Sequence, residues 1–486
     1  MFRSPRSQGC LGFALAALGL CLLAAASASS QEMIDCPAPA GAPGSPHPTI
    51  SPQMFSDVCF LKPDPFGEIP STVFFDDFAW RSFLALAWPA QRGHRGRPDS
   101  SLRLDAPDRP AVFETLKAEW EVFQKDGRDP QSWNDYGGTL PCEIPGNLAF
   151  DDMILASFAK FDSILQANFA AFSGALVSQN GKYVRYSSGF NQTLFQHIAD
   201  GKFFIAKNLH DSFTPFPAAS IRVKASWIEM EGIEKPERFH TRQAWLLDRA
   251  TGRCEQKQVG LVGLHIVAKT PSIPQWVWAT FEHVDNVPGP HASGPLTFNK
   301  GDDKPMPDTN PIACDTTNPC PATPAAPYNV VRVHPIIGDP PADAHPEFST
   351  ADTNKQYRDM LARDYPESRW HNYQLVMTQW PVHPNRPDLD GSIEDTFPGL
   401  NVITGICRTA GTDSTCLTAS ANSTIETFLQ DTVATGCMAC HLIAKQYDYV
   451  SSLLTRPYVE DQSALPGDHA NALNRMRSMF NADSRR

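Results

Sequence analysis

The sequence lacks the excess of positive charge that non-specific nucleic-acid binding requires. Among its 486 residues, 41 are Lys or Arg and 53 are Asp or Glu, so the formal net charge is −12. An acidic chain has no surplus of cations to neutralise phosphates. We therefore expect no nucleic-acid partner.

Several motifs of common protein families are also absent. The chain contains no G-x-G-x-x-G dinucleotide motif, no Walker A loop, no G-x-S-x-G nucleophile motif and no repeat of fixed period. Beyond the N-terminal region, no run is long and apolar enough to span a membrane. We therefore expect neither a nucleotide-binding fold of these types nor a membrane span in the mature chain.

The N-terminus has the features of an export signal. Arg3 and Arg6 precede the apolar run 10–26, and Ala26-Ser27-Ala28 fits a cleavage site after Ala28. A transmembrane anchor is the alternative, but the run is short for that purpose. We expect the mature protein to be periplasmic or otherwise extracytoplasmic.

An oxidising location predicts that the cysteines are paired or ligated. Cys437 and Cys440 belong to a motif described below. The other cysteines of the mature chain are even in number, as expected for disulfide bonds: Cys36, Cys59, Cys142, Cys254, Cys314, Cys320, Cys407 and Cys416. Short loops favour Cys314–Cys320 and Cys407–Cys416 as two pairs, and free buried thiols are the alternative.

Residue patterning predicts an α+β protein with an antiparallel, β-rich central domain and flanking helices. Alternating apolar residues predict strands over 219–230, 238–248, 259–269, 275–284, 328–334 and 372–382. Asn180-Gly181 predicts a hairpin within 174–187. Helical patterns occupy 76–88, 111–123, 152–172, 353–363 and 425–433. The 43 prolines predict many irregular connections, including a long loop over 286–327.

These patterns divide the chain into four segments. A signal peptide occupies 1–28, and a Pro-rich irregular segment follows over 29–74. The helix-flanked β domain covers 75–416, and a small, helical C-terminal segment covers 417–486.

The C-terminal segment contains Cys437-Met-Ala-Cys440-His441, the C-x-x-C-H pattern of c-type haem attachment. Two thiols three residues apart on one helical turn can reach the two vinyl groups of one porphyrin, and the next residue can present its imidazole to the iron. A zinc site would need further ligands nearby, and a thioredoxin-like dithiol would need a βαβ context. A plain disulfide is the remaining alternative. The motif therefore predicts one covalent haem c, with His441 as the proximal iron ligand.

The distal ligand stays open at this stage. Met476 and Met479, on an apparently helical tail, are candidates, although methionine on such a tail is more often a packing residue. Histidines are the other candidates: His265, His283, His334, His371, His383 and His469. An open sixth position would permit small-molecule binding or peroxide chemistry, whereas six-coordinate iron favours electron transfer.

The stretch 259–288 concentrates aromatic and ionisable side chains, among them Trp276, Trp278, Phe281, His265, Lys269, Glu282, His283, Asp285 and Asn286. It could form a haem-facing aromatic wall, a small metal site, or simply a pair of central strands with aromatic core residues, which is the interpretation we adopt. Side chains alternate along a strand, so Glu282, His283 and Asp285 cannot all point the same way without a bend.

Four segments together resemble a group of bacterial exported proteins usually called "cytochrome c family protein". They are FAWRSFLALAWPA (78–90), GLVGLHIVAKTPSIPQWVWATFEHVDNVP (260–288), NYQLVMTQWP (372–381) and NSTIETFLQDTVATGCMACH (422–441). The resemblance implies one covalent haem c on Cys437 and Cys440, with His441 as axial ligand. It assigns no catalytic residues, because the group has no settled substrate.

Three functions follow from these observations. The leading one is electron transfer by a periplasmic mono-haem cytochrome that docks a redox partner protein. The second is a haem-containing oxidoreductase with a site in the β domain. The third is an exported binding module in which haem is structural or sensory.

Overall fold

The structure is a computed structural model. It describes residues 33–36, 49–59, 72–107, 109–138, 140–150, 152–155, 175–248, 251–301, 324, 327–333, 335–336, 349–380, 422–427, 430, 437 and 441–459. The predicted signal peptide and the Cys314–Cys320 and Cys407–Cys416 pairs lie outside these residues.

The described strands are β1 (Met33–Ile34), β2 (Met54–Phe55), β3 (Lys117–Ala118), β4 (Ile154–Leu155), β5 (Arg185–Phe190), β6 (Ile221–Glu229), β7 (Thr241–Leu247), β8 (Cys254–Ala268), β9 (Val277–His283) and β10 (Tyr373–Gln379). The helices are α1 (Thr72–Ala87), α2 (Glu119–Val122), α3 (Gln192–Asp200), α4 (Ala206–Ser212), α5 (Thr350–Asp364) and α8 (Ser452–Thr455). Short 3₁₀ helices are η1 (Val112–Thr115), η3 (Pro236–Arg238), η5 (Arg369–Asn372) and η7 (Leu442–Tyr447).

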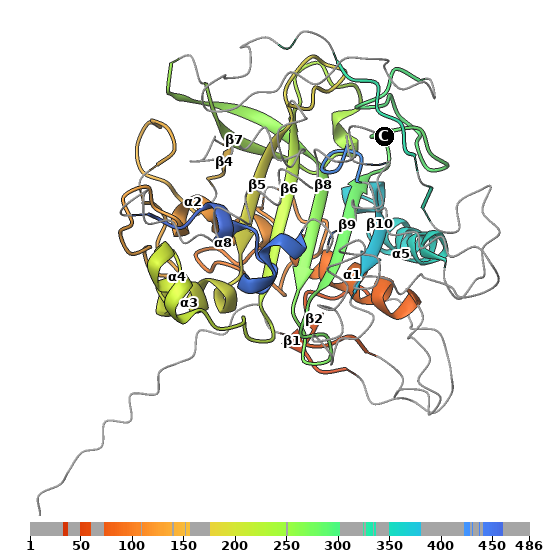
Figure 1. Cartoon of the computed structure of the whole chain (residues 1–486). Coiled ribbons are helices and arrows are strands. Elements are labelled where there is room, and N and C mark those ends of the chain that lie inside the picture. The colour runs from red at the N-terminus through yellow and green to blue at the C-terminus, as the bar shows by residue number, and fades with distance from the viewer. Residues whose placement is uncertain are drawn as a thin grey trace, which may run out of the picture.

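A curled, mixed sheet of eight strands forms the centre of the molecule (Figure 1). Its order is β10-β9-β8-β6-β5-β3, with β7 pairing with β8 and β4 pairing with β7. All pairs are antiparallel except β4–β7. The long strand β8 pairs with β7 along its first half and with β6 and β9 along its second, so the sheet divides into two arms. The predicted α+β class with a β-rich centre is confirmed.

Different segments cover the two faces of the sheet (Figure 1). On one face, α1 and α5 pack through aromatic rings: Phe83 of α1 stacks on Phe281 of β9 at 4.3 Å between ring centroids. Trp278 lies three residues from Phe281, so its side chain points to the opposite face. There it meets His441, which precedes η7. The C-terminal segment and α1 therefore lie on opposite sides of β9.

Most of the predicted strands are present. Strands β6, β7, β8, β9 and β10 fall within or extend the predicted ranges, and the predicted helices near 76–88 and 353–363 are α1 and α5. The hairpin at Asn180-Gly181 is present as a tight turn, with Val177 bridged to Tyr183. The predicted strand at 328–334 is wrong for residues 327–333, which make single hydrogen bonds to Val177 and Phe298 instead of a ladder.

The predicted helix at 111–123 is also wrong, because tertiary contacts break it into η1, β3 and α2. Leu116 is extended, with ψ of 159°, and Lys117 pairs with Phe190 of β5. The fully buried Lys117 ammonium donates to the carbonyls of Ser132 and Asp135. A buried cation needs such acceptors, and a continuous helix would carry it away from them.

Two predicted helices are described only in small part. Residues 154–155 of the 152–172 range form strand β4, and residues 156–172 lie outside the described part. Residues 422–427 form turns where the sequence suggests a helix from 425 onward. Side-chain bonds from Asn422 and Ser423 to β9 favour this turn over a regular helix.

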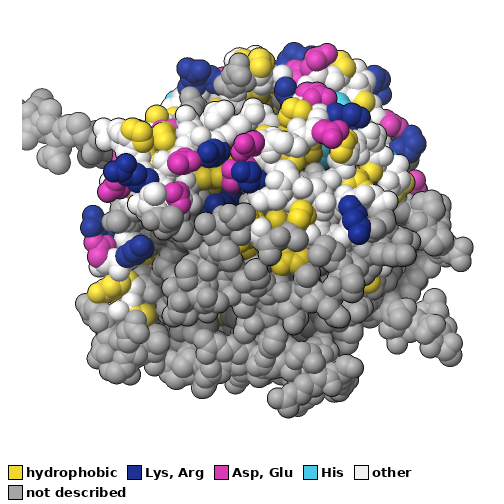
Figure 2. Space-filling view, turned by 90° about the horizontal axis from the view of Figure 1, so that it is seen from above, with side chains coloured by type: hydrophobic (Ala, Val, Ile, Leu, Met, Phe, Trp, Pro, Cys, Tyr) yellow, Lys and Arg dark blue, Asp and Glu magenta, His cyan; other side chains and the backbone are white. Residues whose placement is uncertain are grey.

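Two disulfides, Cys36–Cys59 and Cys142–Cys254, join positions predicted to be oxidised. Within the described ranges, no helix combines the length and apolar character needed to cross a membrane. Seen from above, acidic and basic side chains are interspersed over the described surface and do not gather into a patch of one sign (Figure 2).

Candidate functional site

Cys437 and His441, the first and last residues of the C-x-x-C-H motif, lie on the face of the sheet opposite α1, with Cys437 at the end of β10. Cys437 is partly buried and packs against the main hydrophobic core. Its backbone N–H donates to Oε1 of Gln379, the last residue of β10, at 2.7 Å. Cys440 lies outside the described residues, as do Met476, Met479, His334, His383 and His469.

His441 has one ring nitrogen occupied and one available. Its Nδ1 lies 2.7 Å from the carbonyl oxygen of Tyr449. A carbonyl can only accept, so Nδ1 carries the proton and Nε2 carries the lone pair. Burial, followed by the nearby positive charge of Arg222, lowers the pKa of His441 to about 3. The imidazole is therefore neutral at pH 7, which is the form that binds a metal.

The carbonyl that orients His441 belongs to a tightly held loop. Asp448 and Tyr449 both have positive φ, 51° and 62°, which costs roughly 1–2 kcal/mol per residue. Asp448 Oδ2 accepts from the backbone of Phe216 at 2.9 Å and contacts the Lys269 ammonium. The Trp276 indole donates to the Asp448 carbonyl at 3.0 Å. These contacts stabilise a backbone conformation that presents the Tyr449 carbonyl to His441.

Trp278 forms a wall beside the His441 ring. The two ring centroids are 4.4 Å apart, and the planes are tilted by 51°. Trp278 is only 5% exposed, yet its indole N–H has no hydrogen-bond acceptor among the described residues. A buried donor without a partner costs free energy, so this atom is suited to an acceptor supplied by a bound group.

Cationic side chains lie on the same face of the sheet. Arg222 and Lys224 alternate along β6, and His265 faces the same way on β8. All three lie close enough to His441 to lower its pKa electrostatically, after the larger effect of burial. His265 Nε2 also lies 3.2 Å from Glu426 Oε1. Arg222 in turn lies 3.4 Å from the buried carboxylate of Glu119, so carboxylates accompany the basic side chains on this face.

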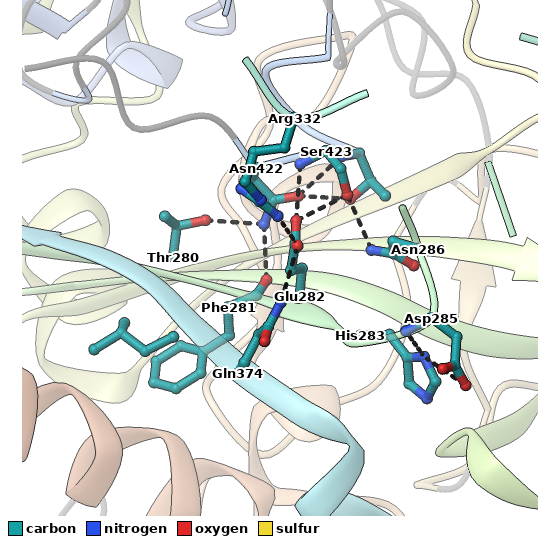
Figure 3. A network of polar contacts seen from close by, with 12 residues as sticks. Thr280, Phe281, Glu282, His283, Asp285, Asn286, Arg332, Gln374, Asn422 and Ser423 are labelled. Atoms are coloured by element: carbon teal, nitrogen blue, oxygen red, sulfur yellow. Dashed lines mark hydrogen bonds and ion pairs between the residues drawn. The ribbon is translucent and has the colours of Figure 1, made fainter. Parts of the chain in front are cut away.

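A polar network fixes the turn 422–427, which leads toward the motif (Figure 3). Asn422 Nδ2 donates to Thr280 Oγ1 at 2.9 Å and to the Phe281 carbonyl at 2.7 Å. Ser423 donates its backbone N–H and its hydroxyl to Glu282 Oε2 at 2.9 and 2.8 Å. Glu282 is fully buried and also contacts Arg332. The turn is thereby bound to the side chains of β9.

Three of the histidines considered as distal ligands are described, and only one of them lies on the same face of the sheet as His441. His283 lies on the α1 side, stacked on Phe239 at 3.9 Å, and its Nε2 contacts the Arg238 carbonyl. Burial lowers the pKa of His283 to about 4. His371 lies in η5, at the start of β10 and far along that strand from Gln379. His265 is the described candidate that shares a face with His441.

The stretch 259–288 builds β8 and β9 rather than a metal site. Every residue of β9 is buried, and Glu282 and His283 point to opposite faces, as alternation requires. Within the part of the chain that the structure describes, no three His, Cys, Asp or Glu side chains are arranged to hold a metal ion. One residue of this stretch, Trp278, does pack against His441 of the C-x-x-C-H motif.

Several residues that organise this site were not singled out as such from the sequence: Gln379, Asn422, Ser423, Asp448 and Tyr449. Each acts through a contact distant in sequence or through a backbone atom. No spacing pattern carries that information.

The residues described here fit a covalently attached haem. His441 presents an oriented nitrogen, Trp278 supplies an aromatic wall and an indole N–H without an acceptor among the described residues, and Arg222 lies near the imidazole. Comparison with known proteins adds nothing to this assignment, since no protein-family model, curated protein or solved structure matches the chain.

Proposed function

We propose that this protein is an exported mono-haem c-type cytochrome that acts in electron transfer. The observation that carries the proposal is the orientation of His441 within C-x-x-C-H: its Nδ1–H is bound to the Tyr449 carbonyl, which leaves Nε2 available as an iron ligand. Such a bond to the second ring nitrogen is the usual way in which proteins orient a metal-binding histidine.

In this proposal, the thiols of Cys437 and Cys440 hold the haem through thioether bonds, and His441 Nε2 is the proximal ligand. Haem iron cycles between its ferric and ferrous states and so accepts and donates single electrons. Trp278 excludes water from one side of His441, and its indole N–H is available to a carboxylate of the haem. Arg222 and Lys224 disfavour positive charge near His441, so they favour the reduced state.

For the distal position we propose Met476 or Met479, two of the candidates that the sequence offers. The partner we propose is a redox protein that docks near the haem. Export by the segment 1–28 to the periplasm is part of the same proposal. The two disulfides support it, because disulfides persist in oxidising compartments.

The experiment is a pyridine haemochrome spectrum after acid–acetone extraction of protein exported in a cell with cytochrome c maturation. We expect about one covalent haem per chain, and none in Cys437→Ala/Cys440→Ala. Cys36→Ala/Cys59→Ala is the matched control, because it also removes a cysteine pair but should keep the haem. Absence of covalent haem from the wild-type protein would refute the proposal.

A second measurement tests the electron-transfer role. Reduction and reoxidation of the purified protein by small mediators should be reversible at a potential within the periplasmic range. A haem that cannot be cycled would leave a structural or sensory role for the group.

A further inference from the structure

Asp76 is a buried carboxyl group that lies behind the C-x-x-C-H site, on the other side of β10. It belongs to α1 and has no exposed surface. Its Oδ2 accepts a hydrogen bond from the Thr350 hydroxyl at 2.7 Å, whereas its Oδ1 has no hydrogen-bond partner. Phe75 stacks on Trp380, with ring centroids 3.7 Å apart, and so holds this part of α1 against the end of β10.

The groups around Asp76 do not stabilise its ionised form. Among the described residues no cation pairs with it, and the neighbouring Asp77 is itself acidic. Asp77 binds the guanidinium of Arg81 at 2.6 Å and accepts from the Tyr357 hydroxyl of α5. From β10, Thr378 approaches Asp76 with an uncharged hydroxyl group. Burial without a cation favours the neutral acid, and burial, reinforced by the charge of Asp77, raises the pKa of Asp76 to about 7.

Strand β10 connects this carboxyl group with the C-x-x-C-H site. Successive side chains of a strand point to opposite faces of the sheet. Thr378 faces Asp76, while the next residue, Gln379, accepts a hydrogen bond from the backbone N–H of Cys437 at 2.7 Å. One strand therefore separates Asp76 from a cysteine that, in our proposal, carries haem.

This separation is short enough for the two sites to interact electrostatically. Groups in contact with opposite faces of one strand lie roughly 10–15 Å apart. At an effective dielectric constant of about 20, a unit charge at this distance shifts a pKa by about one unit. The side chains between α1 and β10 belong to the main hydrophobic core, so mobile ions do not screen the interaction there.

We propose that Asp76 is a redox-linked proton site, which takes up one proton when the haem group is reduced and releases it on reoxidation. The inference rests on the function proposed above and adds a regulation to the same site. The electron comes from the redox partner protein, and the proton comes from water and is held on Oδ1, the oxygen without a partner. Added negative charge near Cys437 favours the protonated form of Asp76, and by linkage a proton on Asp76 favours the reduced haem to the same extent.

The test is a spectroelectrochemical titration of the purified, haem-loaded protein with small mediators at several values between about pH 5 and pH 9. Asp76→Asn keeps the shape of the side chain but cannot exchange a proton. Asp359→Asn is the matched control, because Asp359 is exposed on α5 and pairs with Lys355. Thr350→Val removes the hydrogen bond to Oδ2 that favours the carboxylate, so it tests the same group without replacing it.

We expect the ratio of ferrous to ferric haem at a fixed potential to fall about tenfold from the lowest to the highest pH in the wild type and in D359N. D76N should lose most of this dependence, and T350V should move its midpoint to higher pH. Redox-difference infrared spectra give a second readout: reduction near pH 7 should increase the C=O band of a protonated carboxyl group, and D76N should lack this change.

A pyridine haemochrome spectrum of every sample separates this inference from the proposed function. If covalent haem is present but the pH dependence is the same in the wild type, D76N and T350V, the role of Asp76 is overturned and the cytochrome assignment stands. A wild-type infrared difference spectrum without the carboxyl band would have the same meaning. Absence of covalent haem would overturn both proposals.

Discussion

Glu282 should be the main anchor of the turn that leads to the C-x-x-C-H motif. It is fully buried, accepts two hydrogen bonds from Ser423 and contacts Arg332 (Figure 3). Glu282→Ala would leave the donors of Ser423 and the Arg332 guanidinium facing a buried position without this acceptor. Removing one partner of a buried ion pair typically costs about 3–5 kcal/mol, and we expect a loss of this size in the free energy of unfolding.

A second variant tests the charge of Glu282 alone, and a third is a surface control. Glu282→Gln keeps a carbonyl oxygen for Ser423 but loses the ionic contact with Arg332, so it should cost about 1–3 kcal/mol. Glu255→Ala is the control, because Glu255 is exposed on β8 and, within the described residues, pairs with the exposed Lys257 at 2.9 Å. A surface change of this kind should alter stability by less than about 0.5 kcal/mol.

Urea unfolding followed by tryptophan fluorescence gives the three free energies. Hydrogen exchange then locates the effect: the amides of 422–427 should exchange faster in E282A, while those of α1 keep their protection relative to global unfolding. Covalent haem content should be unchanged, because the thioether bonds do not depend on this anchor. The reasoning would be refuted if E282A were as stable as E255A, or if exchange at 422–427 did not change.

Three other predictions concern stability. Burial raises the pKa of Asp76 from 3.8 to about 7, so the folded protein keeps a proton that the unfolded chain releases, and the free energy of unfolding falls as the pH rises from about 4 to 7. Asp76→Asn should therefore be more stable than the wild type by up to about 4 kcal/mol at pH 8 and by little at pH 4; a stability difference in urea that is equal at both pH values would contradict this. Cys142→Ser/Cys254→Ser opens a disulfide that spans 112 residues, so it should lower the free energy of unfolding by about 2–5 kcal/mol, and equal urea stability of the variant and the oxidised wild type would contradict this. Gly263→Ala would place a methyl group 2.4 Å from Thr424 Oγ1, so it should lower the free energy of unfolding by about 1–3 kcal/mol. An unchanged melting temperature would contradict this, because it would mean that the turn at 422–427 moves to make room for the methyl group.

The strands could be predicted because their sequences carry the period of a sheet. Residues 221–229 alternate and form β6, and the run at 254–268 forms the long β8. Burial on both faces explains why β9 reads as nearly continuous apolar and aromatic sequence. The segment 111–123 could not be predicted in this way, because the position of Lys117 depends on carbonyls of residues 132 and 135 that no local pattern reveals.

The prediction that the C-x-x-C-H motif attaches haem comes from the sequence alone, because the pattern consists of side chains within one helical turn. Its surroundings required the tertiary structure. The bond from His441 to the Tyr449 carbonyl and the contact with Trp278 join residues that are 8 and 163 positions apart in the chain. Neither a backbone acceptor nor a neighbour on a distant strand leaves a local signal.

The pairing of His240 and Arg242 with the buried Glu114 shows the same division in a stronger form. Glu114 lies far from the other two residues in the sequence, and each residue on its own resembles an ordinary surface or core position. Residue types and their periodicity thus determined the fold class and provided the prediction of covalent haem attachment. Only the folded chain decided which ionisable groups share a dry environment, because burial and charge pairing depend on distances that sequence separation does not record.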